Sequence, residues 1–116
     1  MDEFYSQVLK MCREDARYKS GAYEFVMQAV NCTQEKLGRK GHVSGKELLA
    51  EIRRFAMEEF GPMAKTVFEH WGVRSTDDFG QIVFNMVKHG VLSKTDEDSI
   101  NDFHEVYRFE DVFKDE

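Results

Sequence analysis

Five stretches of the sequence repeat apolar residues every three or four positions, which is the spacing of one face of an α-helix. The first covers residues 3–14, and Ser20 can cap a second that continues to about residue 37. Apolar residues occupy two sides of this second stretch, so we expect it to be the central and most buried helix. The pattern predicts a mainly helical domain.

A glycine-rich loop, LGRKGHVSGK, follows the second helix. Within it, Ser44 begins the S-x-x-E pattern of a capping box that Glu47 completes, in which each side chain bonds a free backbone N–H group of the other residue. We therefore expect a third helix to begin here. The loop then separates an N-terminal helical hairpin from the rest of the chain.

The remaining sequence predicts two further helices and a β-hairpin. Gly61–Pro62 ends the third helix and places proline at the first position of a short fourth, and Ser75–Thr76 can cap a fifth. Residues 91–94 and 105–109 are typical of two paired strands across an acidic turn. The apolar residues of 99–107 also have helical spacing, so a helical turn there is the alternative.

A short strand at 42–43, three helices and a hairpin follow one another in the order of a winged helix. The predicted fold class is therefore α+β, mainly helical, with one domain over residues 1–116. Within it, the N-terminal helical hairpin covers 1–38 and a winged-helix-like unit of three helices plus a small β-hairpin covers 42–110.

The composition is that of a folded chain, with 41% hydrophobic residues, ten Phe and one Pro among 116 residues. No apolar run approaches the roughly 18 residues of a membrane helix, and the acidic start MDEFYSQ is unlike a signal peptide. We therefore expect a cytoplasmic protein without a membrane partner. Cys12 and Cys32 lack the spacing of a redox or metal motif and are expected to be reduced.

Three blocks of the sequence, DARYKSGAYEFV, FGPMAKTVFEHWGV and DDFGQIVFN, carry a resemblance to a known family. The chain resembles, over nearly its whole length, an uncharacterised family of small proteins found mainly in planctomycete and verrucomicrobial bacteria. The last two blocks are specific to that family. The resemblance implies a bacterial, cytoplasmic origin, and it implies no activity, because the family has no assigned function, cofactor or catalytic residue.

The sequence departs from known motifs for catalysis or metal binding at one or more required positions. GHVSGKE departs from a phosphate-binding loop because Glu47 stands where a Ser or Thr hydroxyl would hold magnesium. Asp96 and Asp98 match only the first spacing of a calcium loop. The four histidines show no H-x-x-x-H spacing and no neighbouring Cys pair. We expect no cofactor, no metal and no enzymatic activity.

The outward face of the fifth helix is the candidate protein-interaction surface. In a winged helix this face reads DNA, but residues 75–116 contain eleven Asp/Glu and four Lys/Arg, which disfavours phosphate binding. Phe84 lies opposite the apolar stripe and would serve as an apolar anchor with a polar rim, unless the first two helices cover it. The candidate residues are Gln81, Phe84, Asn85 and Lys88.

The leading hypothesis is a non-catalytic protein-interaction or adaptor module with another protein as its partner. The alternative is a nucleic-acid-associated regulator that uses the basic glycine loop, with Lys36, Arg39, Lys40 and Lys46 as its contacts. A second alternative is a small-molecule binder or enzyme, for which a deep pocket lined by His70 or Trp71 would be the sign.

Overall fold

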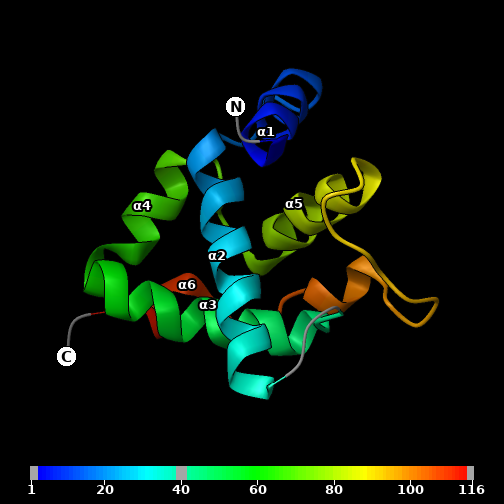
Figure 1. Ribbon diagram of the computed structural model, residues 1–116. Helices are drawn as coiled ribbons and strands as arrows, with labels where there is room; N and C mark the ends of the chain where they lie inside the picture. The colour runs from blue at the N-terminus through cyan, green and yellow to red at the C-terminus, as the bar shows by residue number, and fades with distance from the viewer. Residues whose placement is uncertain (1–2, 39–41, 115–116) are drawn as a thin grey trace.

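The computed structural model describes residues 3–38 and 42–114, and this part of the chain is mainly helical (Figure 1). Its α-helices are α1 (Glu3–Glu14), α2 (Ser20–Leu37), α3 (Gly45–Phe60), α4 (Ala64–His70), α5 (Thr76–Lys88) and α6 (Phe109–Val112). Two 3-10 turns accompany them, η1 (Gly61–Met63) and η2 (Ile100–Phe103). In Figure 1, α2 runs through the middle of the molecule with α4 and α5 on opposite sides. The predictions of helices from the periodic stretches are confirmed.

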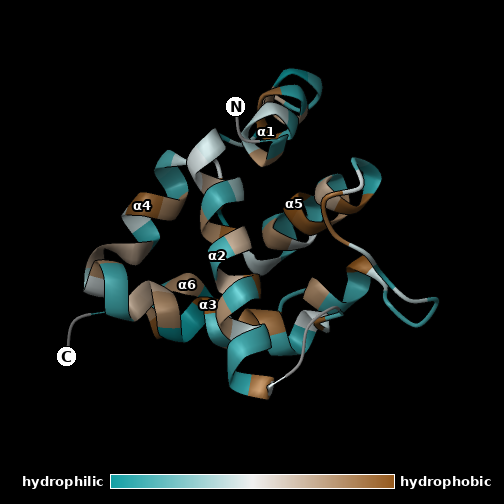
Figure 2. Cartoon of the chain, in the orientation of Figure 1, coloured by the Kyte–Doolittle hydropathy of each residue, from teal (hydrophilic) through white to brown (hydrophobic). Residues whose placement is uncertain are grey.

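The core lies around α2, which contributes more buried residues than any other described helix. The helices α1, α3 and α5 pack against α2, and its buried residues are Ala22, Tyr23, Phe25, Val26, Ala29, Val30 and Thr33. Each of α1 to α5 carries both hydrophobic and hydrophilic residues along its length (Figure 2), as expected for helices that share one core. The expectation that the second helix is central is confirmed.

Phe68 on α4 joins the C-terminal part of the chain to this core. Its fully buried ring packs at centroid distances of 5.1–5.5 Å against four others, which are Phe25, Phe79, Phe109 and Phe113. These rings come from α2, α5 and the α6 region. The aromatic cluster therefore holds the short helices α4 and α6 in place, where their own backbone hydrogen bonds would be too few to stabilise them.

The predicted β-hairpin is wrong, because no residue of 3–38 or 42–114 is in a strand. The backbone N–H groups of Val91 and Leu92 both donate to the carbonyl of Met86, at 2.8 and 3.3 Å. They continue the end of α5, so they cannot pair with a second strand. The predicted short strand at 42–43 is also absent. The winged-helix-like unit at 42–110, which depended on these strands, is therefore not seen.

The second half of the predicted hairpin forms turns. Ser99 and Asp102 make a capping box that begins η2, so the helical alternative for 99–107 holds in part. The hydroxyl of Thr76 donates to the carbonyl of Phe103 at 2.6 Å and accepts from the backbone N–H of Val106 at 3.1 Å. One buried side chain at the start of α5 therefore forms the hydrogen bonds with these backbone groups that a neighbouring strand would have formed.

The capping box predicted at Ser44 is confirmed. The N–H of Glu47 donates to the Ser44 hydroxyl at 3.1 Å, and the Ser44 N–H donates to the Glu47 carboxylate at 2.9 Å. The Cα radius of gyration, 13.5 Å, is close to the ~13 Å expected for a compact domain of this length. Within the described ranges, no helix has both the length and the apolar character needed to cross a membrane.

The turn after α4 packs directly on the α1–α2 connection. Gly72 has a φ of +92°, and a Cβ added there would lie 1.9 Å from the carbonyl oxygen of Arg17. Beside it, the N–H of Lys19 donates to the carbonyl of Trp71 at 3.1 Å. This close backbone approach requires glycine for two separate reasons, the left-handed conformation and the missing side chain.

We predict that Gly72→Ala lowers the free energy of unfolding by about 3 kcal/mol or more, because the methyl group displaces the α1–α2 connection. Gly90→Ala is the matched control: its φ is +74°, but no atom lies within 4 Å of the added Cβ. It should cost about 1–2 kcal/mol from backbone strain alone. Urea unfolding of both variants measures the difference, and equal losses would contradict the proposed contact.

Candidate functional site

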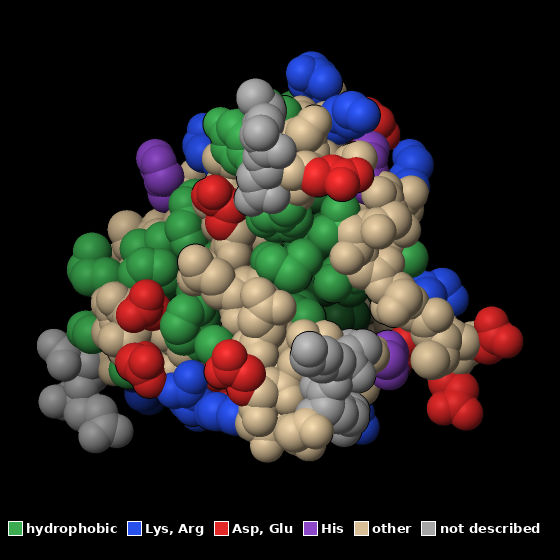
Figure 3. All heavy atoms as spheres, viewed as in Figure 1, with side chains coloured by type: hydrophobic (Ala, Val, Ile, Leu, Met, Phe, Trp, Pro, Cys, Tyr) green, Lys and Arg blue, Asp and Glu red, His purple; other side chains and the backbone are tan. Residues whose placement is uncertain are grey.

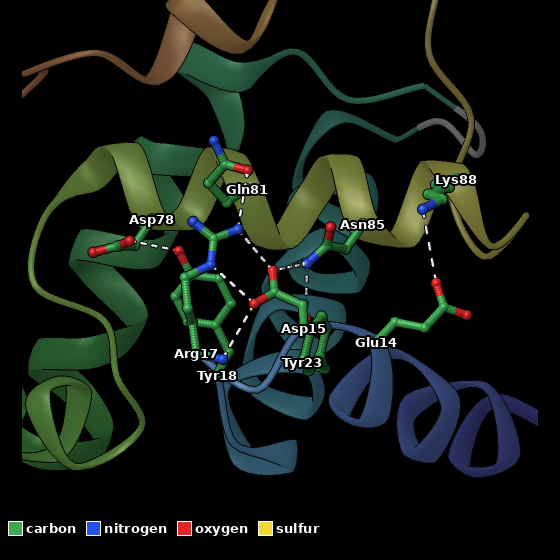
Figure 4. A network of polar contacts seen from close by, with 9 residues as sticks. All are labelled: Glu14, Asp15, Arg17, Tyr18, Tyr23, Asp78, Gln81, Asn85 and Lys88. Carbon is green, nitrogen blue, oxygen red and sulfur yellow. Dashed lines mark hydrogen bonds and ion pairs between the residues drawn. The ribbon is translucent and has the colours of Figure 1, made fainter.

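Residues of the α1–α2 connection form a polar network with α5 (Figure 4). Asp15 lies at its centre and accepts hydrogen bonds from the Arg17 guanidinium at 2.7 and 2.9 Å and from the Arg17 backbone N–H at 3.1 Å. The side-chain amide of Asn85 donates to Asp15 and to the hydroxyl of Tyr23, both at 3.0 Å. One amide on α5 therefore joins the connection to the buried face of α2.

The two other polar residues predicted on this face also contact the N-terminal helices. The guanidinium of Arg17 lies 3.4 Å from the side-chain oxygen of Gln81, and the ammonium of Lys88 lies 3.7 Å from Glu14. The structure therefore places Gln81 and Asn85 against the α1–α2 connection and Lys88 near the end of α1. Docking of a partner on this face of α5 stays a prediction.

The charges of this network are fixed by its hydrogen bonds. The Arg17 side chain, with Asn85 and the Arg17 backbone, holds the pKa of Asp15 well below its usual range, against the opposing effect of burial. Burial and the hydrogen bond to Asp78 raise the pKa of the Tyr18 hydroxyl, which donates to that carboxylate. Asp15 is therefore an ionised acceptor and Tyr18 a neutral donor at physiological pH.

We predict that Asp15→Asn lowers the free energy of unfolding at pH 7 by about 1–2 kcal/mol, because a charged acceptor of several hydrogen bonds is lost. A carboxyl whose pKa falls on folding stabilises the protein above its unfolded pKa of about 3.9, and this contribution is lost as the pH falls through the folded value. The difference in the free energy of unfolding between the variant and the wild type should therefore be smaller in acid. Unfolding of both proteins at pH 7 and pH 3 measures this difference, and Glu24→Gln, at an exposed position, is the control. A difference that is the same at both pH values would contradict the prediction.

Phe84, the fourth predicted residue, does not join this network. It is half-buried, packs against the hydrophobic core and lines a cavity together with Val83 and Val87 of the same helix. The sequence placed all four residues on one outward face. The structure separates them, because the polar three contact the end of α1 and the α1–α2 connection, with Lys88 still exposed, while Phe84 borders the opening between α5 and the segment that follows it.

The cavity is the candidate functional site. It has a volume of about 210 Å³ and opens between α2, α3, α5 and residues 91–99. Its apolar walls include Val30, Leu48, Val83, Phe84, Val87 and Leu92. Its polar mouth includes Gln34, His42, Lys94, Asp98, Ser99 and Asp102. Figure 3 shows hydrophobic side chains in a hollow on this face, with acidic side chains at the outer end of the neighbouring segment.

Two aspartates fix the mouth of the cavity. Oδ2 of Asp98 accepts from the backbone N–H of Thr95 at 2.7 Å and lies 3.2 Å from Nε2 of His42, so it ties the segment after α5 to the segment before α3. Oδ2 of Asp102 accepts from the N–H of Ser99 at 3.0 Å. The sequence predicted only an acidic turn between two strands here. The S-x-x-D spacing of Ser99 and Asp102 was the signal that could have located the turn.

The described residues of the alternative sites are Lys36, Lys46, His70 and Trp71. Lys36 forms an ion pair with Glu51 at 2.9 Å, and Lys46 is exposed at the start of α3. Arg39 and Lys40 lie outside the described residues. His70 is exposed, and Trp71 is half-buried in the aromatic cluster, so neither lines the cavity at α5.

The described residues contain no further candidate site for a metal ion. Over residues 3–38 and 42–114, no three His, Cys, Asp or Glu side chains are grouped so that they could hold a metal ion. Burial raises the pKa of both Cys12 and Cys32, whose thiols are free.

The chain was compared with protein-family models, with curated proteins and with solved structures, and it matches none of them.

We predict that Phe84→Asp lowers the free energy of unfolding by about 2–4 kcal/mol, because it removes apolar contacts and places a carboxylate against the core. Phe84→Leu keeps the apolar surface and should cost less than about 1.5 kcal/mol. Thermal unfolding of both variants distinguishes a wall residue from an exposed anchor. A Phe84→Asp variant as stable as the wild type would show that the ring contributes nothing to the core.

Proposed function

We propose that the protein is a non-catalytic protein-interaction module, and that a partner segment docks at the cavity between α2, α3, α5 and residues 91–99. The observation that carries this proposal is an open cavity with apolar walls and a polar mouth. That is the arrangement of an interface pocket, in which one buried side chain of the partner supplies much of the binding energy and polar groups surround it.

The size of the cavity favours a single side chain as its occupant. Its volume of about 210 Å³ is smaller than the roughly 300–1,000 Å³ of pockets that enclose a small organic ligand. Val30, Leu48 and Val87 come from three different helices that are packed on one core, so the walls are held rigidly. A rigid pocket loses little conformational entropy when it is filled, which favours binding.

The titratable groups at the mouth have structural partners, which supports a binding role over a catalytic one. Asp98 bonds the backbone of Thr95 and pairs with His42, and Asp102 caps η2 through Ser99. Each carboxylate is engaged in holding the backbone that forms the mouth. Lys36, which lies in the last turn of α2 beside the basic glycine loop, is likewise paired with Glu51, which weakens the case for a nucleic-acid surface there.

We predict that Val87→Phe, which adds a ring inside the cavity, lowers partner capture about tenfold or more through loss of the apolar contact. Ser93→Trp, at an exposed position on the mouth, should act in the same direction without disturbing the core. Thr66→Phe is the matched control, since this exposed position on α4 starts from a side chain of similar size.

The measurement is quantitative affinity capture from nuclease-treated native lysate, comparing the proteins retained by the wild type and by each variant. Thermal unfolding of the same samples shows that the variants remain folded. The proposal is supported when the same retained protein is lost with both cavity variants and kept with Thr66→Phe. Equal retention of that protein by the wild type and all three variants would contradict the proposal.

A further inference from the structure

The charged residues beside the cavity are mostly acidic. Residues 93–102 contain three Asp, one Glu and one Lys, and two of these acids, Asp98 and Asp102, line the cavity itself. The ammonium of Lys94 donates to the neighbouring carbonyl of Thr95 at 3.2 Å. Asp96 and Glu97 are exposed at the outer end of the turn. A segment that enters the cavity therefore passes a negatively charged edge.

The two aspartates of the mouth are held in position before any partner arrives. Each uses Oδ2 for the contacts that fix the turn, and within the described part of the chain no hydrogen bond engages Oδ1 of either residue. The Asp98 side chain is only 16% exposed, so it is largely shielded from water. An oriented carboxylate with little solvent around it attracts a cation more strongly than an exposed one.

Of the described basic residues near the mouth, Lys94 lines it, and Lys36 and His42 are paired with acids. Lys36 is paired with Glu51 at 2.9 Å, and that carboxylate also pairs with Arg54 at 2.6 Å. Lys46 is exposed at the start of α3, and no described contact joins it to either mouth aspartate. His42 faces Asp98 at 3.2 Å and is the one described basic side chain that contacts either mouth aspartate.

We infer that the partner segment is basic: it places one bulky apolar side chain in the cavity and a lysine or arginine beside it, against Asp98 and Asp102. This inference rests on the proposed function. The apolar walls supply the affinity, and the carboxylates select the charge of the partner and increase its rate of association. An acidic segment with the same apolar side chain is rejected, because its charges would meet the turn.

The test uses short acetylated and amidated peptides as probes, with a central Phe flanked by lysines, the same Phe flanked by glutamates, or lysines around a central alanine. Titration of the full-length ¹⁵N-labelled chain follows the amides of residues 83–87 and 91–99 by NMR. The lysine–Phe peptide should shift these amides with an affinity at least about tenfold higher than either other peptide, and the difference should decrease as salt is added.

Asp102→Asn removes the charge and keeps an oxygen that can accept the Ser99 N–H, so the turn should be retained. It should weaken the lysine–Phe peptide about threefold to tenfold and leave the glutamate–Phe peptide unchanged or improved. Asp111→Asn, an exposed acid on α6 away from the cavity, is the matched control and should have no effect.

The outcomes separate the two proposals. Equal binding of the lysine and glutamate peptides that contain Phe would overturn the basic partner while leaving the interaction module intact. Equal binding of the two lysine peptides would show that the cavity is not used, and it would overturn the inference. If free indole shifts the cavity amides and no peptide does, the site takes a small molecule and both proposals fall.

Discussion

The burial of α2 on two sides is the constraint on which the other elements depend. Because α2 is apolar on both of these sides, α3 and α5 each have to place an apolar face against it. α4 and α6 are too short to be stable alone, and Phe68 ties them to the same core. The cavity lies where α2, α3 and α5 meet the segment after α5, so the candidate site is a consequence of how three helices share one core.

The helices could be predicted from the sequence because their signals are local. Apolar spacing and the Ser44 capping box depend on residues within a few turns of one another. The prediction of a β-hairpin was wrong because a short apolar stretch does not show which groups its backbone N–H and C=O groups bond. The N–H groups of Val91 and Leu92 donate to the carbonyl of Met86, and the N–H of Val106 donates to the hydroxyl of Thr76, thirty positions earlier.

The candidate site was predictable only in part for the same reason. Helical spacing placed Gln81, Asn85 and Lys88 on one face, but it could not show that Asp15, Arg17 and Glu14 would meet them. Phe84, predicted to be an anchor for a partner, forms part of a cavity wall, and its role in binding stays a prediction. The cavity itself depends on residues such as Val30, Leu48 and Leu92, which are far apart in sequence and carry no shared motif.

The acidity of the chain has a structural use that its net charge does not reveal. Four aspartates each accept a backbone N–H group in a turn: Asp15 from Arg17, Asp78 from Arg74, Asp98 from Thr95 and Asp102 from Ser99. A carboxylate that fixes a turn is itself held in one orientation, so it loses little further entropy when a cation approaches. At the mouth of the cavity the same two side chains that shape the opening therefore also present a preorganised negative charge to whatever enters it.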